Sequence, residues 1–254
     1  MDVADERPGA PVGASARVDN LFLRLHLWLP LALGALLLVL IPATDLDRRF
    51  ALWWAFDAAT GEFPARGTVW ADQILHRGGR LAIWVVELLC MAGWLRAALA
   101  RRHEEARAWA FCVIALALSV GIAGALKQIT NVDCPWDLQG FGGDRPYVWL
   151  FADRPDWLPR AQCFPGSHSA SGFALFALYF GFRDTRPRMA AGALIGALIV
   201  GSVFSFAQQA RGAHFLSHDL TSAFLVWFIC LGLYLWMKRH RRAAATRMYN
   251  DPPK

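Results

Sequence analysis

The chain of 254 residues is 56% hydrophobic, carries 12 tryptophans and has a mean hydropathy of +0.31. Soluble domains average about 45–50% apolar residues, so the composition predicts a membrane protein, for which one domain is sufficient. The formal net charge of +6 does not indicate nucleic-acid binding, because the Lys and Arg residues lie in short loops rather than on one soluble face.

The two ends of the chain are expected to lie outside the membrane domain. Residues 1–20 are polar, rich in Pro, Gly and Ala and without a cleavable signal-peptide pattern, and they are predicted to form a disordered cytoplasmic tail. Residues 21–240 are predicted to form the membrane domain, and residues 241–254 a basic cytoplasmic tail.

Six apolar runs follow one another, each near the ~20 residues that a helix needs to cross about 30 Å of hydrocarbon. They cover residues 25–43, 81–99, 108–126, 168–182, 189–207 and 217–237. The sequence therefore predicts an all-α, polytopic bundle of six transmembrane helices, with a long extracytoplasmic loop between the third and the fourth. The aromatic segments 50–56 and 69–70 are predicted to form short interfacial helices, since Trp favours the membrane interface.

Positive charge is concentrated on one side of this predicted bundle. The two tails and the loops 100–107 and 183–188, with the residues flanking them, hold 16 of the 26 Lys and Arg residues. The positive-inside rule then places both termini in the cytoplasm and the loop 127–167 on the opposite side. We expect a multi-pass protein of a bacterial inner membrane, with its site facing the periplasm.

Three polar stretches fall on that opposite side. The stretch 206–219 contains Gln208, Arg211, His214 and His218, which share one face if the segment is helical. A polar face at a membrane boundary is costly unless it meets water or a ligand, so it indicates a functional site.

The other two stretches flank the long loop. Lys127 ends the third apolar run, where a lysine is either the fixed charge of a site or a side chain that snorkels to the headgroups. The turn Pro165-Gly166-Ser167-His168 opens the fourth run. The free N–H groups of such a turn suit a phosphate, and the alternative is an ordinary N-cap formed by Ser167.

Together these stretches resemble the motifs of the type 2 phosphatidic acid phosphatase (PAP2) superfamily, the membrane lipid phosphatases. That family's pattern is Lys-x6-Arg-Pro, then Pro-Ser-Gly-His, then Ser-Arg-x5-His-x3-Asp. Here Lys127 is followed by six residues and Cys134-Pro135, and the second motif is present with its middle pair exchanged. Gly212-Ala213-His214-Phe215 matches the third motif around its histidine, and the resemblance covers about residues 81–237.

Four positions of the first and third motifs depart from the family pattern, one of them Ala207 in place of the third-motif serine. Cys134 replaces the first-motif arginine, Gln208 replaces the third-motif arginine, and His218 replaces the third-motif aspartate. A rival register pairs Arg211 with His218 but leaves six residues between them instead of five. His214 is therefore the preferred third-motif histidine.

The resemblance implies a metal-independent reaction without a cofactor, in the bilayer and on a lipid phosphate. His214 would attack phosphorus to form a phosphohistidine, and His168 would protonate the leaving oxygen and then activate water. Lys127 and Arg211 would stabilise the equatorial oxygens, as a guanidinium is a natural bidentate phosphate ligand. Other residues expected to bind substrate are Gly166, Ser167, Gln208 and Arg145, with Arg160 as a further candidate arginine. The group that orients the nucleophile is open among His218, Asp219, Asp137 and Asp144.

The five cysteines divide into two groups. Cys134 and Cys163 lie on the external side, beside the first and second motifs, and are expected to form a disulfide if that compartment is oxidising. The bond would tie the Lys127 segment to the Gly166 turn; the alternative is two thiols packed against aromatic neighbours. The cysteines within apolar runs are interpreted as small hydrophobes: Cys90, Cys112 and Cys230.

Two other functions stay open at this point. His214-x3-His218 has metal-ligand spacing on a helix, and with His168 and Asp219 it would describe a membrane metal or haem site. A lipid-binding protein or transporter on a phosphatase scaffold is the non-enzymatic alternative, because the motif arginines are missing. The lipid, the phosphoryl acceptor and the oligomeric state are not specified by the sequence; phosphatidic acid, phosphatidylglycerol phosphate, undecaprenyl pyrophosphate and lipid A phosphates all fit.

Overall fold

The computed structural model of the chain describes residues 20–250, with side chains up to Arg241. Within this range the structure is all-α, and β-pairing is confined to isolated bridges. The predicted tail 1–20, apart from Asn20, lies outside the described residues, as do residues 251–254. The described part of the predicted C-terminal tail continues the last helix to Asn250.

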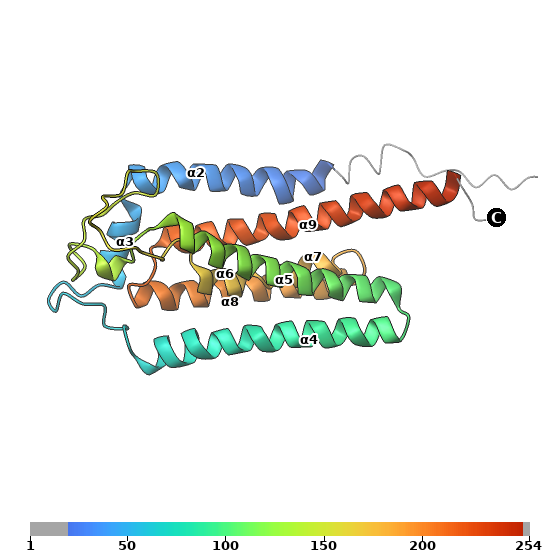
Figure 1. The fold of residues 1–254 in the computed structure, drawn as a ribbon, viewed down its shortest axis with the longest axis horizontal. Coiled ribbons are helices and arrows are strands. Elements are labelled where there is room, and N and C mark those ends of the chain that lie inside the picture. The colour runs from blue at the N-terminus through green and yellow to red at the C-terminus, as the bar shows by residue number, and fades with distance from the viewer. Residues whose placement is uncertain (1–19, 251–254) are drawn as a thin grey trace, which may run out of the picture.

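Five helices are long and apolar enough to cross a membrane, and they lie side by side along the long axis of the molecule (Figure 1). The α-helices of the described residues, short ones included, are α2 (Leu29–Ala43), α3 (Leu46–Trp54), α4 (Gly79–Leu99), α5 (His103–Thr130), α6 (Ser167–Phe173), α7 (Phe176–Phe182), α8 (Pro187–Ala210) and α9 (Leu216–Asn250). α2 continues a helical segment that begins at Asn20, and α4 one that begins at Val69.

The outer faces of these long helices confirm the membrane reading. Large apolar side chains of α2 and α4 are exposed over most of their length, including Leu36, Val39, Leu81, Trp84 and Leu88. A soluble monomer rarely exposes a contiguous apolar surface of this extent, whereas hydrocarbon is its natural solvent. The chain is therefore an integral membrane protein.

The predicted span 168–182 is two short helices rather than one long one. The helical bonding tightens between α6 and α7, where the N–H of Leu175 donates to Gly172 and the N–H of Ala177 donates to Ala174. The sixteen residues from Ser167 to Phe182 would cover about 24 Å as a continuous helix, less than the ~30 Å of hydrocarbon. This pair lies within the bundle, and almost all of α6 is buried.

Small residues allow α6 to occupy the centre. A Cβ atom at Gly172 would lie 2.8 Å from the Cα atom of Gly201 on α8, so the two backbones meet where neither residue has a side chain. Between helices in lipid the hydrophobic effect contributes little, and such close backbone packing is a main source of association. Phe173 and Phe180 complete the contact with α5 and α9 in the main core.

The region between the first two spans differs from its prediction in one part. The short helix expected around Phe50 is present as α3. The interfacial helix expected at Val69–Trp70 is wrong, because Val69–Gly78 is the beginning of the second spanning helix. Two of its polar side chains have partners at the end of α8: Asp72 accepts from Arg211, and His76 accepts from Gln208.

The loop between α5 and α6 forms a cap at one end of the bundle, beside α3 (Figure 1). Asp133 anchors it: its carboxylate pairs with Arg145 at 2.7 Å and with Arg154. An aromatic cluster that includes Phe63, Phe141 and Phe215 packs beneath the cap and joins it to the start of α9. The cap therefore fixes the end of α5, which carries Lys127, relative to the α8–α9 turn.

Candidate active site

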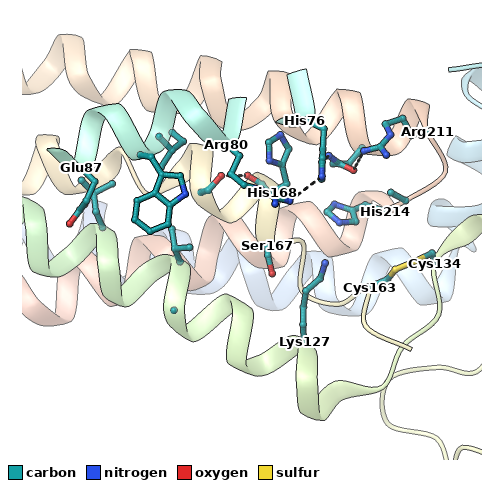
Figure 2. Close-up of a pocket in the computed structure, with 18 of the residues that line it drawn as sticks. His76, Arg80, Glu87, Lys127, Cys134, Cys163, Ser167, His168, Arg211 and His214 are labelled. Carbon is teal, nitrogen blue, oxygen red and sulfur yellow. Dashed lines mark hydrogen bonds between the residues drawn. A yellow bond between two sulfur atoms is a disulfide. The ribbon is translucent and has the colours of Figure 1, made fainter. Parts of the chain in front are cut away.

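A cavity of about 760 Å³ lies between α4, α5, α6 and the α8–α9 turn, below the cap (Figure 2). It brings together residues from all three polar stretches of the sequence. Its polar part is lined by His76, Arg80, Lys127, Ser167, His168, Gln208, Arg211 and His214. Its other end is mostly apolar and includes one carboxylate, that of Glu87; the apolar lining is formed by Ile83, Trp84, Leu116, Ala117 and Val120.

His214 stands in the turn between α8 and α9. The turn is formed by Gly212, whose positive φ of 71° is the left-handed conformation that ends many helices. A Cβ atom there would also clash with the ring of Phe63, so both the backbone conformation and the lack of space require glycine. The helix ends before His214 and a new one begins after it, which leaves the imidazole facing the cavity.

Asp219 holds the imidazole. Its Oδ1 lies 2.7 Å from Nδ1 of His214 and accepts the hydroxyl of Ser169 at 2.6 Å, while its Oδ2 accepts the amide of Gln209 at 2.7 Å. A carboxylate is an acceptor, so Nδ1 of His214 carries the proton and Nε2 has the free lone pair. The arrangement is that of an oriented nucleophile or base.

Gly166 permits this pair to form beside α6. A Cβ atom at Gly166 would lie 2.7 Å from both Nδ1 of His214 and Oδ1 of Asp219. Its N–H donates to the carbonyl of His218 at 3.2 Å, so this N–H is not available to a phosphate. Gly166 therefore serves packing, and the hydroxyl of Ser167 is the polar group of this turn that lines the cavity without a partner among the described residues.

His168, on α6, packs against the segment Val69–Gly78 that leads into α4, whereas Lys127 reaches the cavity from α5. Nε2 of His168 donates to the carbonyl of Leu75 at 3.0 Å, and its ring stacks on Phe204 with centroids 4.3 Å apart. The carbonyl fixes the ring and leaves Nδ1 for another partner. Lys127 extends from α5 toward Ser167 in Figure 2, and among the side chains of residues 20–241 no carboxylate forms an ion pair with it.

Arg211 lies at the cavity but is already paired. Nη2 donates to Asp72 at 2.8 Å and Nη1 donates to the Gln208 carbonyl oxygen at 3.1 Å. Burial lowers the pKa of Arg211, and the charge of Asp72 opposes that effect, so the guanidinium stays ionised. The predicted replacement for the motif arginine thus contributes a partly neutralised charge.

Other predicted residues lie away from the cavity. His218 lines a second, smaller cavity of about 270 Å³, and its ring centroid is 6.0 Å from that of His214. Arg145 is bound to Asp133, and Arg160 donates to the Gln128 carbonyl. Of the four groups left open as the orienting partner, it is Asp219 that touches His214.

Cys134 and Cys163 form a disulfide at the rim of the cavity, with Cα atoms 5.2 Å apart. This distance lies within the usual Cα–Cα range for a disulfide, about 4.4–6.8 Å. The N–H of Cys163 also donates to the carbonyl of Val132 at 3.0 Å. These links tie the end of α5 to the turn that opens α6.

Asp72, His76 and Arg80 belong to the site but were not among the residues predicted from the sequence. They recur at every fourth residue where the helical segment that also contains Gln73 and Arg77 leads into α4. Polar residues at that spacing inside a span are a signal for a functional face, and counting the span from residue 81 removed them from view. Asp219 was among several candidates because it stands five residues after His214 rather than four.

A known family model covers most of the residues of this site. The family model described as the PAP2 superfamily matches residues 107–242, more than half of the chain. The match contains Lys127, His168, His214 and Asp219. It begins after the end of α4, so α4 and the segment that leads into it lie outside the match. No curated protein and no solved structure matches the chain.

Proposed function

Because this chain belongs to the PAP2 superfamily, we propose that it is an integral membrane lipid phosphatase that acts through a phosphohistidine. The observation that carries the proposal is the 2.7 Å contact between Nδ1 of His214 and Asp219, inside a cavity that also contains His168 and Lys127. An oriented imidazole, a second imidazole and an ammonium that has no carboxylate partner among residues 20–241 can supply the nucleophile, the acid and the charge stabilisation of phosphoryl transfer.

In the first step Nε2 of His214 attacks phosphorus, and the bond from phosphorus to the leaving oxygen breaks. His168 gives a proton from Nδ1 to that oxygen, while the Leu75 carbonyl keeps the other ring nitrogen occupied. A bound phosphate places negative charge beside His168 and favours its protonated form. Lys127 and the hydroxyl of Ser167 stabilise the charge on the transferred group.

In the second step water attacks the phosphohistidine. His168, now neutral, accepts the proton of that water, and the bond from Nε2 of His214 to phosphorus breaks. Inorganic phosphate leaves and both histidines return to their starting state. Asp219 stabilises the protonated Nδ1 of His214 throughout, because its carboxylate is held by Ser169 and Gln209.

The shape of the cavity supports a lipid as the substrate. Its polar end lies at the cap, and its other end runs between α4 and α5 along Ile83, Leu116 and Val120. Trp84 and Val120 are also exposed on the outer surface of the bundle, so this end adjoins the lipid-facing side. A hydrocarbon chain fits the apolar end while its phosphate reaches His214.

We further propose that α6 and α7 together form the fourth of six crossings, with both termini in the cytoplasm of a bacterial cell and the site facing the periplasm. The end of the bundle remote from His214 supports this orientation. There Glu105 pairs with Arg96 and Arg186, and Glu104 pairs with Arg241, so the predicted cytoplasmic loops meet in a basic surface. Reporter fusions at residues 100–107 and 183–188 are expected to read cytoplasmic, and a fusion within 138–160 external; the reverse pattern would refute the orientation.

Phosphate release from a panel of phospholipid and isoprenoid phosphates tests the activity. The purified protein is expected to release phosphate from at least one of them without added metal. His214→Ala should remove that activity, and His240→Ala, at the far end of α9, is the matched control. Tight lipid binding with no release from any lipid would instead support the lipid-binding alternative.

A further inference from the structure

His76 and Arg80, on the second spanning helix, line the cavity, and among the described residues no carboxylate pairs with either. Gln208 determines, through its contacts, which nitrogen of His76 carries the proton. Its carbonyl oxygen accepts from Arg211, so its amide nitrogen faces Nδ1 of His76 at 2.7 Å. An amide N–H can only donate, so Nδ1 of His76 is the acceptor and the proton of the neutral ring is on Nε2.

Nε2 of His76 lies 3.2 Å from Nη2 of Arg80. Both nitrogens carry protons, and a guanidinium has no acceptor, so the two groups cannot hydrogen-bond to each other. Two donors that converge at this distance are satisfied together by one anionic oxygen placed between them. No Asp or Glu of residues 20–241 pairs with Arg80, in contrast to Arg211 and Arg77, which both bind Asp72.

His76 and Arg80 lie on the side of the cavity from which the leaving group departs. The ring centroid of His76 lies 4.8 Å from that of His168, the proposed acid. The acid protonates the leaving oxygen, so it marks the side of the cavity on which the leaving group departs. Figure 2 shows Arg80 beyond His168 as seen from His214, in the direction of Glu87 and the apolar end.

We propose that His76 and Arg80 form a second phosphate subsite and that the substrate is a lipid diphosphate. The inference rests on the proposed function and adds the class of leaving group. The terminal phosphate lies at Lys127, Ser167 and His214, and the phosphate attached to the lipid lies at His76 and Arg80. The lipid chain then continues along Ile83 and Trp84.

The reaction balances with these groups alone. Nε2 of His214 forms a bond to the terminal phosphorus, and the bond from that phosphorus to the bridging oxygen breaks. The bridging oxygen leaves on the lipid monophosphate and takes a proton from His168. Water then cleaves the phosphohistidine, so the products are one lipid monophosphate and one inorganic phosphate. A lipid monophosphate as substrate would place an uncharged alcohol oxygen beside His76 and Arg80, so the guanidinium would have no anionic partner from the substrate there.

Two lipids with the same tail test the inference: hexadecyl diphosphate and hexadecyl monophosphate. Since a diphosphate has the better leaving group in any site, the readout is the ratio of their kcat/KM values in each variant. Arg80→Gln is expected to lower that ratio by about 10–100-fold, the usual value of one charge-assisted hydrogen bond, and Arg80→Lys by less. His76→Phe is expected to lower it by roughly 3–10-fold, as for a neutral donor.

Arg77→Gln is the matched control. It lies three residues from Arg80 on the same helix, has an exposed side chain and pairs with Asp72 outside the cavity lining. The ratio should stay within about twofold of the wild type, since only a surface ion pair is lost.

The outcomes separate the two proposals. Wild-type protein that hydrolyses neither these two lipids nor any lipid of the panel would refute the phosphatase itself. Wild-type protein that hydrolyses the monophosphate and not the diphosphate would refute the diphosphate subsite alone. Wild-type protein that hydrolyses both, with a ratio that Arg80→Gln does not change, would refute the diphosphate subsite alone. Should Arg80→Gln fail to fold, the wild type decides: inorganic pyrophosphate is expected to inhibit at a concentration at least tenfold lower than orthophosphate, and equal inhibition would overturn the inference.

Discussion

The two walls of the cavity are built on different principles. On the wall formed by α6 and the α8–α9 turn, His214 and Asp219 are buried, and each oxygen of the carboxylate has a donor. On the opposite wall, Arg80 is exposed and lies beside a second donor. The first wall lies within the family match, and the second lies outside it.

Under the proposed function, the first wall holds the groups that react and the second holds the groups that recognise the substrate. A reacting imidazole needs one tautomer and one orientation, which a saturated network of hydrogen bonds supplies. A group that recognises a charged substrate must keep its donors free until the substrate arrives. Experiments on the two walls should therefore give different kinetic results, large losses of kcat on the first and changes of selectivity on the second.

The largest effect is expected from His214 and His168, the two histidines proposed to react. His214→Ala and His168→Ala should each lower phosphate release by about 10⁴-fold or more, because the nucleophile or the acid is lost. Rates measured on a lipid that the wild type cleaves test this, with His240→Ala as control. A His214→Ala protein that keeps more than a tenth of the wild-type rate would place the nucleophile elsewhere.

Asp219→Asn should be the next largest. The amide donates where the carboxylate accepted, so it favours the wrong tautomer of His214, and kcat is expected to fall by about 10²–10⁴-fold with little change in KM. Asp137→Asn, at an acid of the cap 3.7 Å from Arg145, is the control. If KM rises and kcat is kept, Asp219 binds substrate rather than orienting the imidazole.

Arg211 should have a smaller and coupled effect, since it joins the two walls through Asp72 and Gln208. Arg211→Lys keeps the charge but loses the planar fork, and we expect about a tenfold loss of kcat/KM. The double variant Asp72→Asn with Arg211→Gln should lose less than the sum of the single variants, by about 0.5–3 kcal/mol of interaction free energy. Strict additivity would show that the pair does not act as a unit.

The disulfide should affect stability more than catalysis. It closes a loop with a sequence separation of 29, for which the chain-entropy model gives roughly 3–4 kcal/mol of unfolding free energy. Reductant should therefore lower the melting temperature of the wild type, and it should have no further effect on a Cys134→Ser, Cys163→Ser double variant. An unchanged melting temperature after full reduction would remove the cap's proposed covalent support.

Much of the architecture was predictable because it depends on local composition. Long apolar runs mark the spans whatever their neighbours are, since hydrocarbon requires every backbone group to be satisfied within the helix. The order and spacing of the motifs around Lys127, His168 and His214 carried the family, which the match to residues 107–242 confirms. The pairing of Cys134 with Cys163 followed from their positions beside the first two motifs.

What only the tertiary structure decided is which side chains meet across helices. The helical face drawn through Gln208, Arg211, His214 and His218 assumed one continuous helix, but the left-handed turn at Gly212 interrupts it. That interruption rotates His218 away from the cavity and brings Asp219 to His214. His76 and Arg80 join the site from a helix far away in the sequence, and no local pattern records that contact, because it arises from packing against α8.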